Sequence, residues 1–349
     1  MKVLVTGGAG FIGSHVAEYY LRRGHRVVVY DNLSRSTTLH ARMVKDTFNW
    51  KYLKKNYDKA SLIRGDVRNF KSILQASRNA DVIIHAAAQV AVTISERDPR
   101  ADFEMNALGT FNVLEAARRN DSSVVYCSTN KVYGDNINRI AIRESEKRYY
   151  FLDEKFKNGI TEDFPVDLCS HSPYGCSKLT GDLYAQDYAS TYGLKTGIFR
   201  MSCIYGERQF GVEDQGWVSW FVIATLTRRP VTIYGDGKQV RDLLYVNDLV
   251  DGYDAFVKSK LKHGVFNIGG GPLNTVSILE FLDVLEELTG KKPKTSFADW
   301  RPADQKIYVS CISKIGEKLN WQPKVNFRKG IERVVNWVNQ NVESMLSLI

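Results

Sequence analysis

The sequence predicts an α/β fold with a doubly wound parallel sheet and a smaller C-terminal α/β cap. Short apolar runs typical of buried strands alternate with helical segments through the first 200 residues, and this alternation favours parallel strands with helices on both faces. A glycine-rich turn follows the first strand, as in sheets of this class. The 349 residues are 44% hydrophobic and 25% charged, which fits a globular protein and excludes a disordered chain.

The first expected elements form a βαβ unit. Residues 2–6 and 26–30 are short apolar strands, and between them apolar residues recur at helical spacing until Gly24 ends the helix. The same alternation predicts strands at residues 61–64, 81–85, 123–127 and 195–199, and helices at 72–76, 101–119 and 173–192. Because helices connect these buried strands, we expect the strands to be parallel.

After residue 200 the alternation becomes less regular, which predicts the smaller cap. The expected elements are helices at 217–227, 247–258, 278–289 and 329–342 and strands at 231–234 and 265–268. The polar, charge-rich stretch 135–172 predicts an insertion or lid, because it separates two motifs that we expect in one site.

Charge and composition exclude several other classes. The formal net charge is +9, yet lysines and arginines come in short interrupted groups, so we expect neither nucleic acid nor a membrane surface as a partner. No run of about 18 apolar residues or signal-peptide pattern is present, and we expect a cytoplasmic protein. Five scattered cysteines and six separated histidines predict neither disulfides nor a bound metal.

The turn after the first strand predicts a dinucleotide site. Residues 6–13 read Thr-Gly-Gly-Ala-Gly-Phe-Ile-Gly, which satisfies Gly-x-Gly-x-x-Gly and the wider spacing of Gly7, Gly10 and Gly13. Glycines permit a tight turn and the close approach of a pyrophosphate, which binds at the N-terminus of the following helix. This context predicts a Rossmann domain.

Asp31 predicts which dinucleotide binds. It ends the second strand, 18 residues after Gly13, where a carboxylate accepts the hydroxyls of an adenosine ribose and repels a 2′-phosphate. Arg35 could offset that repulsion, so NAD is favoured and NADP stays open. Asp66 and Ala86–Ala88 follow the third and fourth strands at the sheet edge where such folds bind ligands.

A tyrosine and a lysine open the helix expected at 173–192. The spacing of Tyr174 and Lys178 puts both on one helix face. A phenol titrates near pH ~10, so it serves as a base at neutral pH only beside a cation, here Lys178 and a positive nicotinamide. Thr129, after the fifth strand, can offer a hydroxyl to the reacting oxygen. The predicted catalytic residues are therefore Tyr174, Lys178 and Thr129.

Together these motifs identify a family resemblance. They are Thr6-Gly7-Gly8-x-Gly10-Phe11-Ile12-Gly13, Asp31-Asn32-Leu33-Ser34-Arg35, Tyr133-Gly134, Tyr174-x-x-x-Lys178, Tyr205-Gly206-x-Arg208-Gln209, Arg241-Asp242 and Arg301-Pro302-x-Asp304. The set resembles the extended short-chain dehydrogenase/reductase family, also called the NAD-dependent epimerase/dehydratase family, over nearly the whole chain. The resemblance implies a nucleotide-sugar enzyme with tightly bound NAD.

Two positions narrow the implied reaction. Dehydratases of this family carry Asp-Glu after the threonine, and the related decarboxylases carry Glu before Val-Tyr-Gly, whereas this chain has Asn130 and Lys131. The acids that dehydratases and decarboxylases use are therefore absent, which leaves epimerisation or simple oxidation as the implied reaction.

The longer motifs are most similar to the branch of the family that inverts C2 of CDP-sugars. Residues 128–134, the end of the 135–172 insertion and residues 208–217 carry this similarity. It implies oxidation of C2 to a 2-keto sugar and return of the hydride to the opposite face. The alternatives are a nucleotide-sugar 4-epimerase, a sugar dehydrogenase of the same family, or a non-catalytic NAD-sensing or RNA-binding relative, which retention of Tyr174, Lys178 and Thr129 disfavours.

The resemblance and the sheet-edge positions together imply the binding residues. The expected cofactor-binding residues are Gly7, Gly10, Phe11, Ile12, Gly13, Asp31, Asn32, Ser34, Arg35, Asp66, Val67, Ala86, Ala87, Ala88, Asn106, Ser128, Tyr174 and Lys178. The expected substrate-binding residues are Gln89, Thr129, Arg208, Gln209, Gln215, Trp217, Gln239, Arg241, Arg301 and Asp304. Arg241 and Arg301 are expected on the diphosphate, because guanidinium groups match phosphate oxygens, whereas Cys203 replaces the Asn that commonly contacts it.

The resemblance also implies a domain division. We expect an NAD-binding Rossmann domain at residues 1–200 and 240–268, with 135–172 as its insertion, and a nucleotide-sugar-binding domain at 201–239 and 269–349. A homo-oligomer, either dimer or tetramer, is expected.

Overall fold

The computed structural model describes residues 1–38, 48–301 and 304–346, and the chain divides into two compact units. Unit 1 comprises Met1–Val132, Pro173–Arg200 and Val250–Phe266. Unit 2 comprises Tyr133–Ser172, Met201–Leu249 and Asn267–Ile349. We expected residues 240–249 in the first domain, but they fall in unit 2, because strand β11 (Val240–Tyr245) pairs with other strands of that unit.

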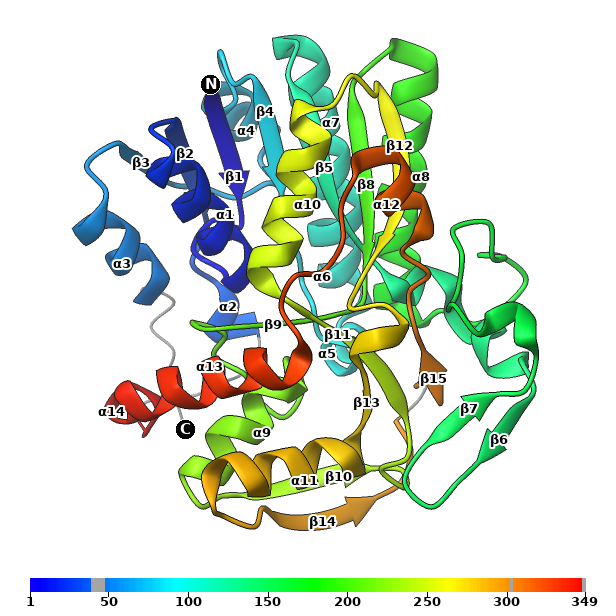
Figure 1. Ribbon diagram of the computed structural model, residues 1–349. Helices are drawn as coiled ribbons and strands as arrows, with labels where there is room; N and C mark the ends of the chain where they lie inside the picture. The colour runs from blue at the N-terminus through cyan, green and yellow to red at the C-terminus, as the bar shows by residue number, and fades with distance from the viewer. Residues whose placement is uncertain (39–47, 302–303, 347–349) are drawn as a thin grey trace. The chain divides into compact units, whose positions relative to one another are not determined.

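Unit 1 is built on a seven-stranded sheet (Figure 1). In spatial order its strands are β12 (His263–Ile268), β8 (Thr196–Met201), β5 (Ser123–Thr129), β4 (Val82–His85), β1 (Lys2–Thr6), β2 (Arg26–Asp31) and β3 (Ala60–Arg64). The chain runs outward from β1 to β3 and then returns to the other side of β1 as β4, with parallel pairing throughout these strands. The predicted doubly wound α/β fold is confirmed, and the reversal between β1 and β4 is where such sheets bind ligands.

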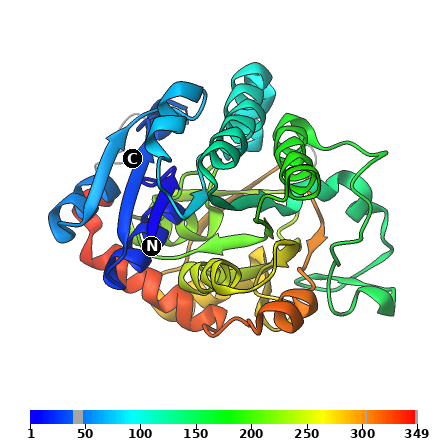
Figure 2. The same ribbon diagram turned by 90° about the horizontal axis from the view of Figure 1, so that it is seen from above.

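Helices cover both faces of this sheet (Figure 2). On one face lie α1 (Phe11–Arg22) and α10 (Val246–Lys258), and on the other lie α4 (Phe70–Ala76), α7 (Gly109–Asn120) and α8 (Ser172–Tyr192). The shorter helices are α2 (Arg35–Thr38), α3 (Phe48–Asn56), α5 (Val92–Arg97) and α6 (Pro99–Phe103). Buried Leu4, Ile83 and Val124 of the sheet pack against α4, α7 and α8 in one apolar core.

The helix expected at 101–119 is interrupted, which the periodicity did not predict. Helix α6 ends at Phe103, a π-helical segment η1 follows at Glu104–Leu108, and α7 begins at Gly109. Asp98 caps the start of α6, because its side chain accepts a hydrogen bond from the backbone N–H of Ala101 at 2.9 Å. Single π turns inside helices are frequent at functional sites.

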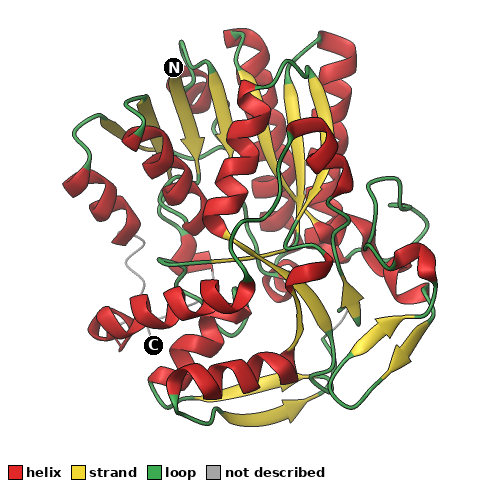
Figure 3. Cartoon of the chain, viewed as in Figure 1, coloured by secondary structure: helices red, strands yellow, loops and turns green. Residues whose placement is uncertain are grey.

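Unit 2 contains three small sheets (Figure 3). Strands β13 (Thr275–Ser277), β11, β15 (Ile307–Tyr308) and β9 (Cys203–Tyr205) form one, β10 (Pro230–Tyr234) and β14 (Lys294–Ala298) another, and β6 (Ile142–Glu144) and β7 (Tyr149–Phe151) a hairpin. Its helices are α9 (Trp217–Leu226), α11 (Ile278–Thr289), α12 (Ser313–Leu319), α13 (Phe327–Gln340) and α14 (Val342–Leu346), with 3₁₀ turns η2 (Asn130–Arg139), η3 (Glu154–Phe156) and η4 (Pro272–Asn274). Most of its short strands were not predicted, since two to six residues carry too little periodicity.

The stretch 135–172, expected as an insertion of the first domain, falls in unit 2 instead, because hydrogen bonds tie it to other segments of that unit. The Tyr133 hydroxyl donates to Asn267 Oδ1 at 2.7 Å, and Asn267 Nδ2 donates to the Ile160 carbonyl at 2.8 Å. Arg148, between the hairpin strands, donates to Thr275 Oγ1 at 2.9 Å. These bonds fix both the beginning of the stretch and its hairpin.

Candidate functional site

The glycine turn of unit 1 has no space for a side-chain carbon at Gly7 or Gly13. A Cβ at Gly13 would lie 2.1 Å from the Gly7 carbonyl oxygen, and one at Gly7, which has φ of +66°, would lie 2.6 Å from the Ala87 backbone nitrogen. Helix α1 begins at Phe11, with Gly10 as its N-cap and no capping side chain. The N-terminal N–H groups of α1 therefore suit an anion, as a dinucleotide requires.

Asp31 stands at the carboxyl end of β2 beside this turn. Its Oδ2 accepts the Ala9 N–H at 2.9 Å and its Oδ1 accepts the Leu33 N–H at 2.7 Å. Both bonds orient the carboxylate, and a carboxylate oxygen can accept more than one hydrogen bond. The geometry fits the ribose contact that the sequence predicts.

Next to Asp31, several predicted cofactor residues are connected by hydrogen bonds. Asn32 Nδ2 donates to Asp66 Oδ2 at 3.0 Å, and the Ser34 hydroxyl donates to Asn32 Oδ1 at 2.7 Å. Arg68 makes a two-pronged contact with Asp66 at 3.0 and 2.8 Å. Burial raises the pKa of Asp66, but the hydrogen bonds from Arg68 and Asn32 outweigh it and hold the pKa at about 2.

Other predicted cofactor residues lie at neighbouring strand ends of unit 1. Ala86 donates its N–H to the Thr6 carbonyl at 3.1 Å, so the loop of Ala86 to Ala88 follows β4 directly against β1. Val67 is buried, and its carbonyl accepts a bond from Asn112 at 3.0 Å. The Phe11 ring contacts His15 edge to face, and Ile12 and Arg35 are partly exposed.

The structure brings the predicted catalytic pair of Tyr174 and Thr129 together. Tyr174, on the first turn of α8, is 9% exposed, and its hydroxyl is hydrogen-bonded to Thr129 at the end of β5. Burial raises the pKa of Tyr174 to about 12, against the opposing effect of the Thr129 bond. With a pKa this far above 7, the Tyr174 hydroxyl keeps its proton at neutral pH.

Lys178, one turn after Tyr174 on α8, is held by the end of β5. Its Nζ donates to the Cys127 carbonyl at 2.6 Å and lies 4.4 Å from the centre of the Tyr126 ring. Burial lowers the pKa of Lys178 to about 8, although Cys127, Asp102 and Asp182 act in the opposite direction. Lys178 is thus a buried cation, 3% exposed, that can lose its proton in mildly alkaline solution.

Ser128, predicted to bind the cofactor, faces a buried ion pair. Its hydroxyl donates to Asp182 Oδ2 at 2.6 Å. Arg200 contacts the same carboxylate with two bonds of 3.1 Å, and Asp182 is fully buried. This pair connects α8 with β8 and balances the charge of Asp182.

Gln89 and Asn106 belong to a buried network that the sequence did not reveal. Gln89 Nε2 and Asn106 Nδ2 donate to Asp102 Oδ1 at 2.8 and 3.0 Å, and the Ser177 hydroxyl donates to Asp102 Oδ2 at 2.5 Å. Asp102 is 1% exposed. Sequence reasoning missed it because a lone carboxylate on an amphipathic helix is typical of a solvated face.

In unit 2, each of the two predicted diphosphate-binding arginines pairs with a carboxylate. Arg241 donates to Asp304 Oδ1 at 2.8 Å, and Arg301 donates to Asp214 Oδ1 at 3.2 Å. The Arg301 guanidinium also lies 3.9 Å from the centre of the Tyr234 ring. Pro302, part of the motif, lies outside the described residues.

Other predicted substrate residues occupy the interior of unit 2. Gln209 donates to the Ile204 carbonyl at 3.2 Å and accepts from Ser219 at 2.6 Å. The Trp217 indole donates to Cys203 Sγ at 3.4 Å and contacts Phe281 edge to face, so this side chain is also part of an aromatic core.

Three further predicted substrate residues have distinct settings in unit 2. Arg208 is buried with φ of +60°, and the Gln215 backbone closes a turn with Val212. Gln239 is 4% exposed, donates to the Tyr234 carbonyl at 2.8 Å, and has no partner for Oε1 within the described ranges.

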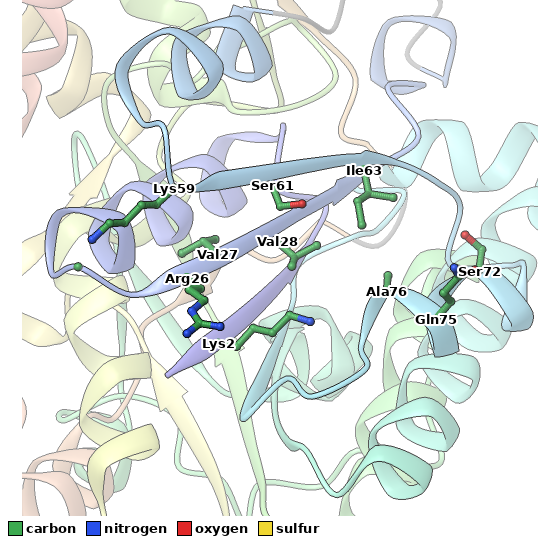
Figure 4. A pocket seen from close by; sticks show the side chains of 11 residues that line it. Lys2, Arg26, Val27, Val28, Lys59, Ser61, Ile63, Ser72, Gln75 and Ala76 are labelled. Carbon is green, nitrogen blue, oxygen red and sulfur yellow. The ribbon is translucent and has the colours of Figure 1, made fainter.

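A hollow of about 780 Å³ opens elsewhere on unit 1 (Figure 4). Its lining includes Lys2, Arg26 and Lys59 over an apolar floor with Val27 and Val28. These cations stand at the amino ends of β1, β2 and β3, at the opposite end of the strands from Asp31. No predicted site residue lines this hollow.

Comparison with known proteins decides the family. Residues 3–269 match the NAD dependent epimerase/dehydratase family. The chain belongs to this family. Its members use NAD, and the resemblance stated from the motifs is confirmed.

The relatives of this epimerase/dehydratase include enzymes for different nucleotide sugars. A CDP-paratose 2-epimerase of Salmonella typhi is 39% identical over 97% of this chain and 99% of that protein. A putative UDP-glucose 4-epimerase of Methanocaldococcus jannaschii is 32% identical over 97% of this chain and 99% of that protein. The crystal structure of a UDP-glucuronic acid 4-epimerase of Bacillus cereus, with UDP-glucuronic acid and NAD, has a TM-score of 0.81 and 29% identity, covering 97% and 99% of the two chains.

Within the described ranges, no helix has the length and apolar character needed to cross a membrane.

Proposed function

We propose that this family member inverts C2 of a CDP-linked sugar, in a reaction of the CDP-paratose to CDP-tyvelose type. The observation that carries the proposal is the 39% identity to the Salmonella typhi 2-epimerase over nearly the full length of both chains. The two 4-epimerases reported above share 32% and 29% identity. Asn130 and Lys131 agree with epimerisation, because the carboxylic acids that dehydratases and decarboxylases of the family carry at these positions are absent.

Tyr174 is the proposed base, and Thr129 the proposed hydrogen-bond partner of the reacting oxygen. Tyr174 accepts the proton of the C2 hydroxyl when C2 is oxidised and returns it when C2 is reduced on the opposite face. Thr129, already bonded to the Tyr174 hydroxyl, is within reach of the same substrate oxygen. NAD, when bound, supplies the acceptor for the C2 hydride and a positive charge that favours the phenolate.

The glycine turn and Asp31 are the proposed NAD site, with Lys178 contacting the ribose. A redox cycle that ends with the starting oxidation state gains nothing from releasing its cofactor, so we expect NAD to survive purification. Denaturing the purified protein and analysing the supernatant tests this expectation. NADP alone, or no nucleotide together with no affinity for NAD, would contradict it.

Arg241 and Arg301 are proposed to bind the substrate diphosphate. Each is now held by a carboxylate, so phosphate oxygens would share or replace those contacts. The buried Oε1 of Gln239 offers an acceptor for an amino or hydroxyl group of the substrate.

Product analysis distinguishes the candidate reactions. The purified protein is incubated with CDP-, UDP-, GDP- and dTDP-sugars, and the products are identified by NMR. Inversion at C2 of a CDP-sugar supports the proposal. Inversion at C4 of a UDP-sugar, which the named 4-epimerase relatives favour, or accumulation of NADH as in a sugar dehydrogenase, would replace it.

Isotope retention tests the route. If the hydride leaves C2 and returns to C2, a C2-deuterated CDP-sugar turned over in ordinary water gives a product that keeps its deuterium. Deprotonation and reprotonation of C2 would instead replace the deuterium with solvent hydrogen. Tyr174→Phe serves as the control without a base.

The homo-oligomer, dimer or tetramer, stays a prediction. A candidate contact surface lies on unit 1, where Phe111 of α7 and Tyr184 of α8 touch edge to face at 5.6 Å. Leu183 and Tyr192 extend this exposed apolar surface along α8. Light scattering on the wild type and on Leu183→Glu tests it, because a charge there would weaken an apolar contact between copies.

A further inference from the structure

Asp102 is a buried carboxylate that the proposed reaction does not use. It lies near the end of α6, directly before the π-helical segment, and both of its oxygens accept hydrogen bonds inside the protein. Burial raises the pKa of Asp102, which is 1% exposed, whereas the hydrogen bonds that its two oxygens accept favour the ionised form. Such a charge is costly to bury without a nearby positive charge.

Asp102 holds the first turn of α8 through one hydroxyl. The Ser177 hydroxyl donates to Asp102 Oδ2 at 2.5 Å and lies 3.1 Å from the Tyr174 carbonyl oxygen. Asn106 Nδ2 reaches Asp102 at 3.0 Å and the Ser177 hydroxyl at 3.2 Å. Ser177 lies between Tyr174 and Lys178 on this helix, so the network fixes the segment that carries both.

The titratable groups of β4 and β5 near Lys178 carry no charge at neutral pH. On β4, burial lowers the pKa of His85 to about 3, so it is neutral. On β5, burial raises the pKa of Cys127 to about 11, so this thiol is neutral at pH 7, and Tyr126 contributes its ring face. These groups leave the Lys178 charge without a balancing anion on the sheet side.

Two carboxylates, Asp102 and Asp182, raise the pKa of Lys178 against the effect of burial, and one of them is already paired. Asp182 of α8 is bound by Arg200 of β8 through two hydrogen bonds. Asp102 has no ion-pair partner in the parts of the chain that the structure describes. Its bond to Ser177, the residue directly before Lys178, ties this carboxylate to the same turn of α8. Burial raises the pKa of Asp102, and the charge of Lys178 opposes that effect.

We propose that Asp102 is a positioning residue for the active-site helix and the counter-charge that keeps buried Lys178 protonated at neutral pH. The inference deepens the proposed function and rests on the roles given there to Tyr174 and Lys178. The variant Asp102→Asn removes the negative charge and keeps the shape of the side chain. Its amide oxygen can still accept from Gln89 and Asn106, and its amide nitrogen can donate to the Ser177 hydroxyl.

The first experiment does not depend on catalysis. The free energy of unfolding is measured by urea between pH 6 and 10 for the wild type, Asp102→Asn, Lys178→Met and the double variant. Because the folded-state pKa of Lys178 lies below that of a free lysine, the unfolded state binds more protons, and stability rises with pH above about 8. In Asp102→Asn the rise in unfolding free energy should begin about one pH unit lower than in the wild type. In proteins that carry Lys178→Met, the Asp102→Asn change should no longer displace the pH dependence of stability.

The second experiment measures the pH dependence of turnover. Loss of the negative charge lowers the pKa of both Lys178 and Tyr174, so the whole pH–rate profile of Asp102→Asn should move to lower pH. If Asp102 had only a structural role, Asp102→Asn would lower the maximum rate and leave the pH of that maximum unchanged. Asp187→Asn, an exposed carboxylate on the same helix, should leave both profiles unchanged.

The two experiments separate the failure of this inference from that of the proposed function. An unfolding profile of Asp102→Asn that matches the wild type, or a displacement that persists without Lys178, overturns the role of Asp102. If the unfolding displacement appears but no sugar is epimerised, the electrostatic pairing stands and the proposed function fails.

Discussion

Lys178 donates a 2.6 Å hydrogen bond from Nζ to the backbone carbonyl of Cys127. The bond connects the first turns of α8 to the end of β5, two residues before Thr129. Because the strand end carries Thr129 and the helix carries Tyr174, this contact fixes the distance between a hydroxyl donor and the proposed base. Lys178 therefore also positions α8 against β5, in addition to supplying a positive charge.

Replacing the proposed base should remove turnover and leave the fold intact. Tyr174→Phe deletes the phenol oxygen and keeps the buried ring, so kcat should fall by ~10²–10⁴, the range typical of a lost general base, while substrate affinity changes little. Steady-state kinetics and calorimetric binding measure the two effects. Tyr192→Phe, exposed at the end of α8, is the matched control, and near-normal turnover of Tyr174→Phe would exclude the assignment.

Buried His85 should make stability sensitive to acid. Its ring nitrogens contact Thr6 Oγ1 at 2.7 Å and Thr110 Oγ1 at 3.0 Å, and burial lowers its pKa to about 3. Between pH 3 and about 6.5 the unfolded chain binds a proton that the folded protein does not, so stability falls as pH falls through this window.

The matching experiment compares slopes rather than absolute stabilities. In urea unfolding between pH 4 and 6, His85→Gln should reduce the slope of the unfolding free energy by up to ~1.4 kcal/mol per pH unit. Equal slopes for wild type and His85→Gln would show that His85 titrates normally.

Asp31 should set the choice between NAD and NADP. Asp31→Asn removes the charge that repels a 2′-phosphate, so the ratio of the NADP and NAD dissociation constants should shift toward NADP by about tenfold, or ~1.4 kcal/mol. Nucleotide titrations of the cofactor-free protein measure both constants. Exposed Asp58→Asn matches the change in net charge, and an unchanged ratio would place the ribose contact elsewhere.

The close approach at the glycine turn predicts a position-specific loss of stability. Gly13→Ala would put a Cβ 2.1 Å from the Gly7 oxygen and 2.8 Å from the Gly8 Cα, so it should cost about 1–3 kcal/mol or more and weaken NAD binding. Gly316→Ala, in α12 with its nearest atom at 3.4 Å, should gain about 0.5–1 kcal/mol. Thermal unfolding compares them, and a neutral Gly13→Ala would show that the turn can relax.

The local pattern of the sequence determined the sheet, the glycine turn and the position of the catalytic candidates. Strand β1 spans the expected residues 2–6, α11 spans the expected 278–289, and Tyr174 and Lys178 lie four residues apart on α8. These features depend on apolar periodicity and on residues four apart, which are properties of neighbouring positions.

Only the tertiary structure decided which charges meet. Arg241 pairs with Asp304, 63 positions away, and Ser177 bonds to Asp102, 75 positions away. Lys178 donates to the Cys127 carbonyl, 51 positions away, and β11 joins unit 2 through strands too short to show a period. A buried charge takes whichever partner the packing brings within hydrogen-bond distance, and that distance is set by the crossing of helix and strand, which no local pattern records.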